Sequence, residues 1–345
     1  MLALALAGCA SVEPPPPAPI TDAEMRAIVA TLSSDEFAGR MPGTPGGDRT
    51  VAYIAERFRA AGLVSGSTGG APFLEPFTVK ATERKLPADA KLPAGQRYFT
   101  EQINKAKPFT SWNVVGRVPG RRPDGKIVVV MGHWDHLGTC MPEGSPDRIC
   151  NGAVDNASGI AAMIAVAERV ARLRLDRDVW FIATSAEEWG LLGAKALAEK
   201  PPFALSSIIA GFNLDTIAIA SKGAPVAIVA PEGSRLEPLV RAAAQAVGRA
   251  WDGDDEADPF IQRQDGWAFS QRGAPVIMAG GSFSNLALLQ KFLGAAYHGP
   301  EDELRADTDL GGAVDDANLH VELVRRAASR GHLPSFAGIP KVARR

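Results

Sequence analysis

Residues 127–136 read Ile-Val-Val-Val-Met-Gly-His-Trp-Asp-His, and this stretch decides the fold class of the chain. The apolar, mostly β-branched run at 127–131 is typical of a strand that is buried on both faces of a sheet. His133 and Asp135 follow it directly. Because ligands of open α/β sheets gather at the carboxyl ends of the strands, the stretch predicts an α/β protein with its site at this strand end.

Strands and helices alternate on both sides of this stretch. Further strands are expected at 113–116, 179–183, 208–214, 225–230 and 275–279. Helices are expected at 158–173, 191–199, 235–247, 285–293 and 314–328. This order predicts one α/β domain, a three-layer α/β/α arrangement with a mixed, largely parallel central sheet. The domain is expected to cover residues 21–330, followed by a solvated tail at 331–345.

The chain before the first of these strands is less regular. Residues 21–24 form a capping box that predicts a helix to about residue 32. A second helix is expected at about 49–61, ending at Gly62. A strand is expected near 76–79, and the polar, weakly patterned residues 81–108 are expected to form an extended surface excursion.

Composition is that of an ordinary globular protein. The chain has 345 residues, 46% hydrophobic and 22% charged, with a net charge of −2. Nucleic-acid binding requires a concentrated Lys/Arg surface, and this sequence predicts none. No partner besides a substrate, and no oligomeric state, follows from the sequence.

The N-terminus resembles the end of a lipoprotein signal peptide. Residues 1–9 are apolar and end in Leu6-Ala7-Gly8-Cys9, which is similar to a bacterial lipobox. The run is too short to span a bilayer, which needs about 20 apolar residues. A Pro-rich linker follows at 10–20. We therefore expect a protein anchored to the cell envelope through a lipid on Cys9, facing the periplasm or the exterior.

The two remaining cysteines bracket a short loop. Cys140 and Cys150 lie on either side of residues 141–149, which are rich in Gly, Pro and Asp. In an oxidising compartment they are expected to form a disulfide, and two free buried thiols are the alternative.

Acids and histidines follow the other strands too. The set comprises Asp155 before a helix, Glu187 and Glu188 after 179–183, Asp215 after 208–214, and His298 in a late loop. Together with His133 and His136 after the strand at 127–131, His298 makes three of the five histidines that lie in such segments. Imidazole and carboxylate without thiolate are the ligands of a catalytic zinc site with open positions. The helical His-Glu-x-x-His motif is absent from the sequence.

The ordered set His-x-Asp, Asp-Asn-Ala-Ser-Gly, Glu-Glu, Asn-Leu-Asp and Tyr-His resembles the bacterial leucyl aminopeptidase family of two-zinc exopeptidases. Relatives of that family include glutamate carboxypeptidase and glutaminyl cyclase. The resemblance covers about residues 22–328, with its motifs at 112–302, and the segment 33–44 is also similar. Many relatives carry an inserted protease-associated domain, for which residues 80–111 are too few.

The resemblance implies a role for each motif residue. Asp155 would bridge two zinc ions. His133 and Asp215 would complete one zinc site, and Glu188 and His298 the other.

Two further acids would act without binding metal. Asp135 would orient the imidazole of His133. Glu187 would be the general base and acid, taking a proton from a zinc-activated water and giving it to the leaving amine. Tyr297 is a candidate donor to the oxyanion.

Three functions remain open for this site. The first is an aminopeptidase acting on peptides. The second is another reaction on the same fold, that of a carboxypeptidase or a glutaminyl-cyclase-like transferase, and cyclases of this type use one zinc ion. The third is a non-catalytic binding domain. The sequence argues against it, because Glu187 and all five expected ligand residues are present.

Some residues receive no firm role. Asp265 aligns with a family acid that a His usually follows, but Gly266 stands there instead. Core packing is favoured over pocket lining for a set of aromatic residues, namely Trp134, Trp189, Trp267 and Phe269. His136 is left unassigned, and His320 and His332 are expected at the surface.

Overall fold

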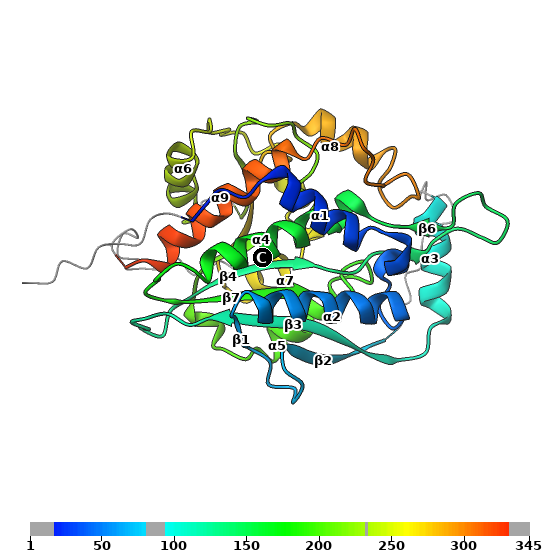
Figure 1. The fold of residues 1–345 in the computed structure, drawn as a ribbon, viewed down its shortest axis with the longest axis horizontal. Coiled ribbons are helices and arrows are strands. Elements are labelled where there is room, and N and C mark those ends of the chain that lie inside the picture. Colours follow the sequence, from blue (N-terminus) through cyan, green and yellow to red (C-terminus); the bar gives the residue numbers. More distant parts are fainter. Residues whose placement is uncertain (1–16, 81–93, 232–233, 331–345) are drawn as a thin grey trace, which may run out of the picture.

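A layered α/β domain emerges from the computed structural model, which describes residues 17–80, 94–231 and 234–330 (Figure 1). Eight strands in these ranges form one sheet in the order β1-β3-β7-β4-β8-β10-β9, with β2 paired to β3. The strands are β1 (Val64–Ser65), β2 (Leu74–Val79), β3 (Phe109–Val118), β4 (Ile127–His133), β7 (Asp178–Thr184), β8 (Ile208–Asn213), β9 (Ala227–Val229) and β10 (Val276–Gly280).

The centre of the sheet is parallel and its margins are antiparallel. Strand β4 runs parallel to both β7 and β8, and β10 runs parallel to β8. Strands β3 and β9 pair antiparallel with β7 and β10. His133 lies opposite Thr184, and Met131 opposite Asn213, so the carboxyl ends of β4, β7 and β8 meet at one edge. The predicted mixed, largely parallel sheet is confirmed.

Successive residues of β4 feed two different cores. Val128 and Val130 belong to one apolar cluster, and Val129 and Met131 to another. This alternation is that of a strand covered on both faces, which explains why the run 127–131 lacks polar residues.

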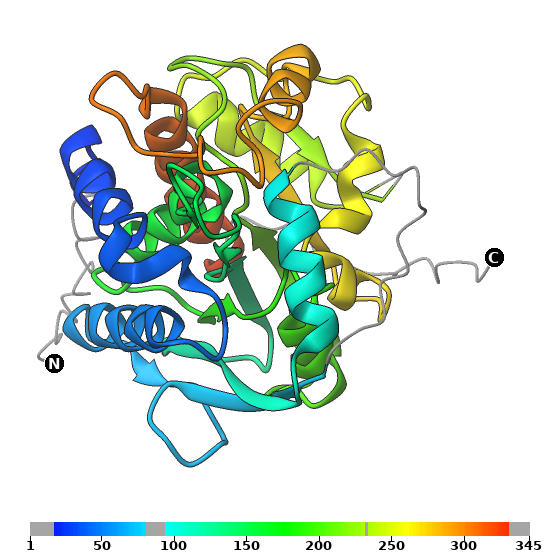
Figure 2. The same cartoon turned by 90° about the vertical axis from the view of Figure 1, so that its right-hand side faces the viewer.

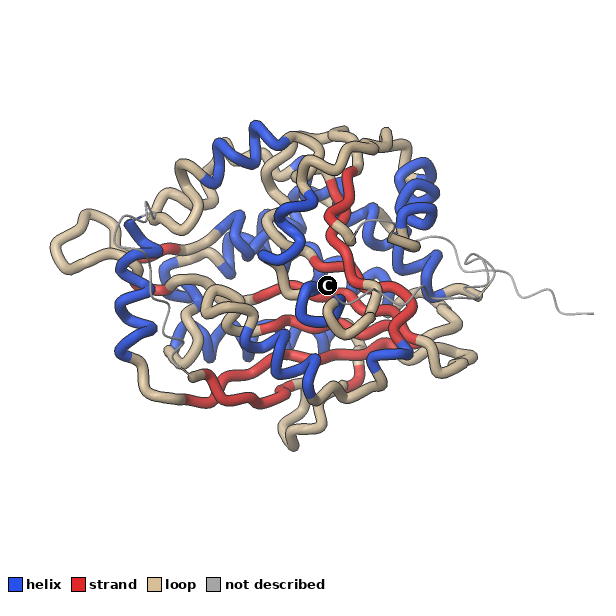
Figure 3. Tube along the Cα trace, turned by 180° about the vertical axis from the view of Figure 1, so that it is seen from behind, coloured by secondary structure: helices blue, strands red, loops and turns tan. Residues whose placement is uncertain are grey.

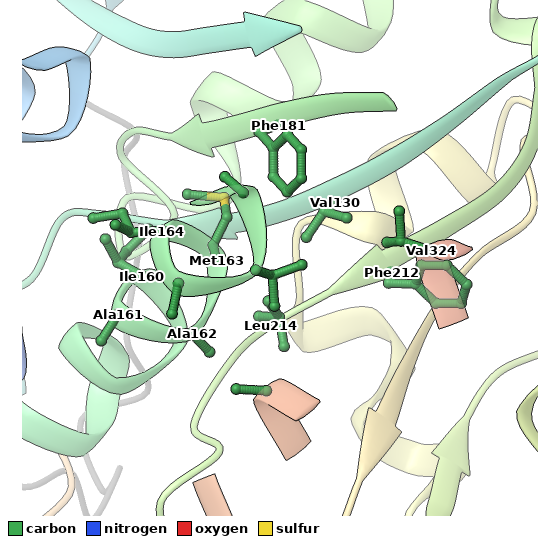
Figure 4. Packing of buried hydrophobic residues seen from close by; sticks show 14 of the residues in the cluster. Val130, Ile160, Ala161, Ala162, Met163, Ile164, Phe181, Phe212, Leu214 and Val324 are labelled. Atoms are coloured by element: carbon green, nitrogen blue, oxygen red, sulfur yellow. The ribbon is translucent and has the colours of Figure 1, made fainter. Parts of the chain in front are cut away.

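Helices cover both faces of the sheet (Figures 1 and 3). One layer contains α1 (Asp22–Leu32), α2 (Pro45–Ala60), α4 (Gly159–Val170), α6 (Glu237–Ala246) and α9 (Gly311–Ala328), and the other contains α5 (Leu192–Glu199) and α7 (Gly266–Ser270). Figure 4 shows Met163 of α4 beside Phe181 of β7 within this apolar cluster. The three-layer arrangement follows from the two apolar faces of the sheet.

Both helices predicted before residue 62 are present in the structure. Thr21 and Glu24 form the expected capping box at α1. Helix α2 begins at Pro45, before the expected residue 49, because Thr44 caps it and proline occupies its first position. Shorter helical turns lie at Asp35–Arg40, Ala153–Ser158, Leu205–Ser207 and Asp258–Arg263.

The expected extended excursion over residues 81–108 is wrong where the structure describes it. Residues Ala94–Lys105 form helix α3, which lies at the same end of the molecule as β6 (Ile149–Cys150) (Figures 1 and 2). Phe99 and Ile103 are buried, one helical turn apart, against Trp189. The apolar residues of α3 do recur at helical spacing, but the polar residues between them dominate the composition of the segment. Residues 81–93 lie outside the described ranges.

The disulfide between Cys140 and Cys150 is confirmed. It closes the loop between β5 (Gly138–Thr139) and β6, which pair antiparallel as a small second sheet. Helix α8 (Leu286–Leu293) and the loop after it line a pocket that also contains His133, the last residue of β4. Cys9, residues 10–16 of the linker and the tail at 331–345 lie outside the described ranges.

The surface position expected for His320 is wrong, because its side chain is fully buried in α9. Its Nδ1 lies 2.7 Å from the carbonyl oxygen of Asp316, and its ring packs edge-on against Phe212. Burial lowers the pKa of His320 to about 4, so the imidazole is neutral and fits an apolar interface. His332 lies outside the described residues. None of the described helices combines the length and the apolar character needed to cross a membrane.

Candidate metal centre

The carboxyl ends of β4 and β8 and the turn Ala153–Ser158 bring the first three predicted ligands together. His133 is the last residue of β4, and Asp215 follows β8. The Nε2 atom of His133 lies 3.3 Å from Oδ1 of Asp155 and 3.4 Å from Oδ1 of Asp215. All three side chains are buried, so their charges face one another in a low-dielectric site.

The remaining two predicted ligands approach the other oxygen of Asp155. The Nε2 atom of His298 lies 3.3 Å from Oδ2 of Asp155 and 2.9 Å from Oε2 of Glu188. Asp155 thus presents one oxygen to His133 and the other to His298. Both groups of side chains that could hold a metal ion contain Asp155.

Unpartnered donor atoms show that these residues fit a metal ion. Oε1 of Glu188 and both ring nitrogens of His298 are buried and have no hydrogen-bond partner among the described residues. A buried polar atom without a partner costs about 1–3 kcal/mol, which a coordinated cation would offset. Nitrogen and carboxylate oxygen donors with no thiolate suit catalytic zinc.

The segment that carries Asp155 is fixed from a distant loop. The carboxylate of Asp302 accepts the backbone amides of Val154 at 2.8 Å and of Asp155 at 3.0 Å. Asn156 donates to the carbonyl oxygens of His133 and Leu214. Asp302 was not predicted as a site residue, although its position four residues after His298 could have suggested it.

Arg40 is a second residue that sequence reasoning missed. Its guanidinium is buried and donates to the carbonyl oxygens of Leu32, Trp134, Asn151 and Gly152. Burial lowers the pKa of Arg40 to about 10, against the raising effect of Asp155, so it stays charged at neutral pH. The Arg40 guanidinium therefore links the N-terminal segment at residues 33–44 to the loop after His133 and to the loop before Asp155.

Asp135 contacts both the imidazole of His133 and the Glu187–Glu188 segment. Its carboxylate accepts the backbone amides of Glu187 at 3.1 Å and Glu188 at 3.4 Å. The Nδ1 atom of His133 lies 3.1 Å from the backbone carbonyl oxygen of Asp135 and 3.9 Å from its carboxylate. In this structure the Asp135 carboxylate therefore positions the Glu187–Glu188 backbone, and its backbone carbonyl faces the imidazole.

Glu187 lies in the same pocket as the metal-facing residues without joining their cluster. Burial and the carboxylate of Glu188 raise the pKa of Glu187 well above its usual value, against the opposing effect of His133. A carboxylate with a raised pKa inside a pocket is suited to exchanging protons with a substrate or a water molecule.

The pocket has an acidic floor and an apolar wall. Its acidic side is formed by His133, Asp155, Glu187 and Asp215, and its wall by Phe260, Met278, Phe283, Leu289 and Leu293. The cavity between them has a volume of about 50 Å³. The ring of Tyr297 stacks on that of His298 with centroids 3.6 Å apart, and Arg263 lies 3.3 Å from its hydroxyl.

The other residues that received no firm role lie outside this pocket. Trp134, Trp189 and Phe269 are buried in apolar clusters, as the favoured interpretation predicted, and Trp267 is half-buried beside Phe269. Asp265 is buried and accepts a hydrogen bond from Thr184. Burial raises the pKa of Asp265 to about 6.

An open α/β sheet with buried nitrogen and oxygen donors at its carboxyl edge defines the class of metal-dependent α/β enzymes. Residues 113–321 match the family model described as Peptidase family M28, and the chain belongs to this family of zinc metallopeptidases. The candidate ligands described above lie inside the matched range.

Curated relatives are similar over part of their length. The alkaline phosphatase isozyme conversion protein of Escherichia coli K12 is 27% identical over 198 residues, 54% of this chain and 49% of that protein. Aminopeptidase YwaD of Bacillus subtilis is 35% identical over 134 residues, 37% of this chain and 27% of that protein. The chain thus spans about half or less of these relatives.

Solved structures of low sequence identity share the fold. A peptidase M28 precursor from Shewanella amazonensis has a TM-score of 0.66 at 15% identity, covering 94% of this chain and 96% of its own. An aminopeptidase from Aneurinibacillus has a TM-score of 0.61 at 18% identity, covering 93% and 97%. A glutaminyl cyclase from Porphyromonas gingivalis has a TM-score of 0.58 at 16% identity, covering 88% and 97%. The fold therefore accommodates both reactions.

Proposed function

We propose that this protein is an aminopeptidase that removes N-terminal residues from peptides by zinc-dependent hydrolysis. The observation that carries the proposal is the position of Glu187, which lines one pocket with His133, Asp155 and Asp215. A proton-transfer group beside metal-facing donors is what hydrolysis of an amide bond requires.

The proposed metal content is two zinc ions per chain. His133 and Asp215 would hold one ion, Glu188 and His298 the other, and Asp155 both. Bound zinc supplies a water of lowered pKa and polarises a substrate carbonyl. The distances of Asp155 to both histidines support a shared ligand.

Glu187 is proposed to move the proton. Its carboxylate takes the proton of the attacking water and delivers it to the leaving amine. Asp135 assists by holding the amides of Glu187 and Glu188, which fixes where the two neighbouring carboxylates point. The hydroxyl of Tyr297, stacked beside His298, is a candidate donor to the substrate carbonyl oxygen.

The pocket supports an exopeptidase that selects the N-terminus. The acids on its floor would attract a free α-ammonium group, and its wall of Phe260, Met278, Phe283, Leu289 and Leu293 would accept an apolar first side chain. Two similar proteins, from Bacillus subtilis and Aneurinibacillus, are named aminopeptidases, and this supports cleavage from the N-terminus. Peptides beginning with Leu, Met or Phe are expected to be the best substrates.

A peptide pool tests the reaction. One mixed pool is divided, half is N-acetylated, and products are followed by mass spectrometry. Stepwise loss from free N-termini alone is expected. C-terminal trimming would instead show a carboxypeptidase, loss of ammonia from N-terminal glutamine a cyclase, and equal cleavage of both pools an endopeptidase; each would overturn the proposal.

Attachment to the cell envelope through a lipid on Cys9 is also proposed. The disulfide between Cys140 and Cys150 supports it, because such bonds persist in exported proteins. Mass analysis of the mature N-terminal peptide from cells is the test. A diacylglyceryl adduct on Cys9 is expected, and an unmodified N-terminus that includes residues 1–8 would overturn this part of the proposal.

A further inference from the structure

His136 lies among the metal-facing donors although the resemblance gives it no role. It follows His133 by three residues and its side chain is fully buried. Its Nδ1 lies 2.8 Å from Oε1 of Glu188 and 3.9 Å from Oδ2 of Asp155. These three side chains place one donor atom each within 4.8 Å of one another, close enough to share a metal ion.

The contact with Glu188 lacks the geometry of a hydrogen bond. Both ring nitrogens of His136 and Oε1 of Glu188 have no hydrogen-bond partner among the described residues. Leaving three such atoms buried and unpartnered is unfavourable. Unpartnered nitrogen and oxygen donors that converge at this distance are in the arrangement of ligands around a cation.

The ring of His136 packs against the backbone of Gly152. Gly152 has φ +57°, and a Cβ there would lie 2.5 Å from Cδ2 of the ring, so the absence of a side chain makes room for the imidazole. Arg40 donates to the carbonyl oxygens of Asn151 and Gly152 and thereby fixes this wall. The ring of His298 lies nearby, with the two ring centroids 5.7 Å apart.

We infer that His136 is an additional metal ligand, binding through Nδ1 beside Asp155, Glu188 and His298. This inference rests on the proposed metal centre. It makes the two positions unequal, because one has three protein residues and the other four. The position with His136 is therefore expected to bind divalent metal more tightly and to fill first.

Cobalt tests the inference with a signal that does not depend on activity. In the Co²⁺-loaded protein, a ligating imidazole gives a paramagnetically shifted proton on its second ring nitrogen, and this proton exchanges with water. Three such signals are expected in ¹H NMR spectra, from His133, His136 and His298. Two signals in a fully loaded protein would overturn the inference, because an imidazole that only contacts Glu188 is not a ligand.

Variants assign the third signal. His136→Gln is expected to remove one shifted signal and to weaken one of the two Co²⁺ sites by about 100-fold or more, since even residues that only orient a ligand change affinity by about 10–100-fold. His136→Asn serves if the glutamine variant does not fold. His320→Gln, at a buried histidine of α9 away from the centre, is the control and should keep all three signals.

The two proposals fail separately. Wild-type protein that binds two Co²⁺ ions and shows only two histidine signals keeps the proposed metal centre but excludes His136 from it. Wild-type protein that binds no Co²⁺ or Zn²⁺ overturns both.

Discussion

The carboxylate of Asp302 accepts the backbone amide of Asp155 at 3.0 Å, so the loop that carries His298 also fixes the segment that carries Asp155. The same carboxylate holds the amide of Val154 at 2.8 Å. The positions of the segment with Asp155 and the loop with His298 are therefore coupled, because a shift of either one breaks these hydrogen bonds.

Replacing Asp302 with Ala should weaken metal binding without removing a ligand. The change leaves two backbone amides without their acceptor, and the resulting loss of zinc affinity is expected to be about 10–100-fold. Competition with a chelator of known affinity measures it. The neighbouring exposed residue offers a matched control, Glu301→Ala, which should bind zinc like the wild type. Equal affinity in both variants would show that Asp302 does not position Asp155.

Removing zinc should lower both turnover and thermal stability. The buried donors of His133, Asp155, Glu188 and His298 lose the cation that offsets their burial. Metal bound at a concentration 100 times its Kd contributes about 2.7 kcal/mol to the free energy of unfolding. Differential scanning fluorimetry with and without a chelator measures the shift, and added Zn²⁺ should reverse it. An unchanged Tm after complete metal removal would contradict a structural link between the metal and the fold.

The disulfide should stabilise the domain measurably. It closes a loop with a sequence separation of 10, for which the loss of unfolded-state entropy corresponds to about 2–3 kcal/mol. Urea denaturation of a Cys140→Ser, Cys150→Ser double variant should show this decrease in the free energy of unfolding. Reductant should destabilise the wild type and leave the double variant unchanged. Equal stability of wild type and double variant would contradict the prediction.

Asp176 should make stability depend on pH at the acidic end. A hydrogen bond from the backbone amide of Arg330 and the guanidinium of Arg122 lower the pKa of Asp176 below its usual value, against the effect of burial. The unfolded chain then binds the proton more readily than the folded one, so this stabilisation is complete above the unfolded pKa of about 3.9 and is lost as the pH falls through the lower folded pKa.

Asp176→Asn tests that sign. The variant should lose about 1 kcal/mol in the free energy of unfolding at pH 7, and its difference from wild type should shrink as the pH falls below about 4. Urea denaturation at several pH values measures both. The exposed Asp307→Asn is the control and should show no such trend. A difference that grows towards acid pH would reverse the assigned sign.

The fold could be predicted because its signals are local. Each apolar strand run is followed within a few residues by its own acid, as β4 is by Asp135 and β8 by Asp215, and parallel pairing brings the strand ends together. Helix α3 was missed because Phe99 and Ile103 are its main buried apolar residues. His320 was placed at the surface because its neutral state depends on burial within α9, which the sequence does not reveal.

The supporting residues of the site could not be predicted because their partners are remote. Arg40 binds carbonyl oxygens 111 and 112 residues away, and Asp302 binds amides 147 and 148 residues away. These bonds go to backbone atoms, which carry no sequence signature. The sequence shows His136 close to His133 but assigns it no role. Its proposed role as a ligand depends on the 2.8 Å distance between its Nδ1 and Oε1 of Glu188.

The most direct measurement compares turnover and zinc content in Glu187→Gln. Glu187 is proposed to move the proton, and it is not one of the proposed metal ligands. Hydrolysis of a peptide that begins with Leu should therefore fall by about 10²–10⁴-fold in this variant. Zinc per chain, measured by inductively coupled plasma mass spectrometry, should stay at the wild-type value. A variant that keeps both zinc and most of its activity would contradict the assignment of Glu187 as the general base.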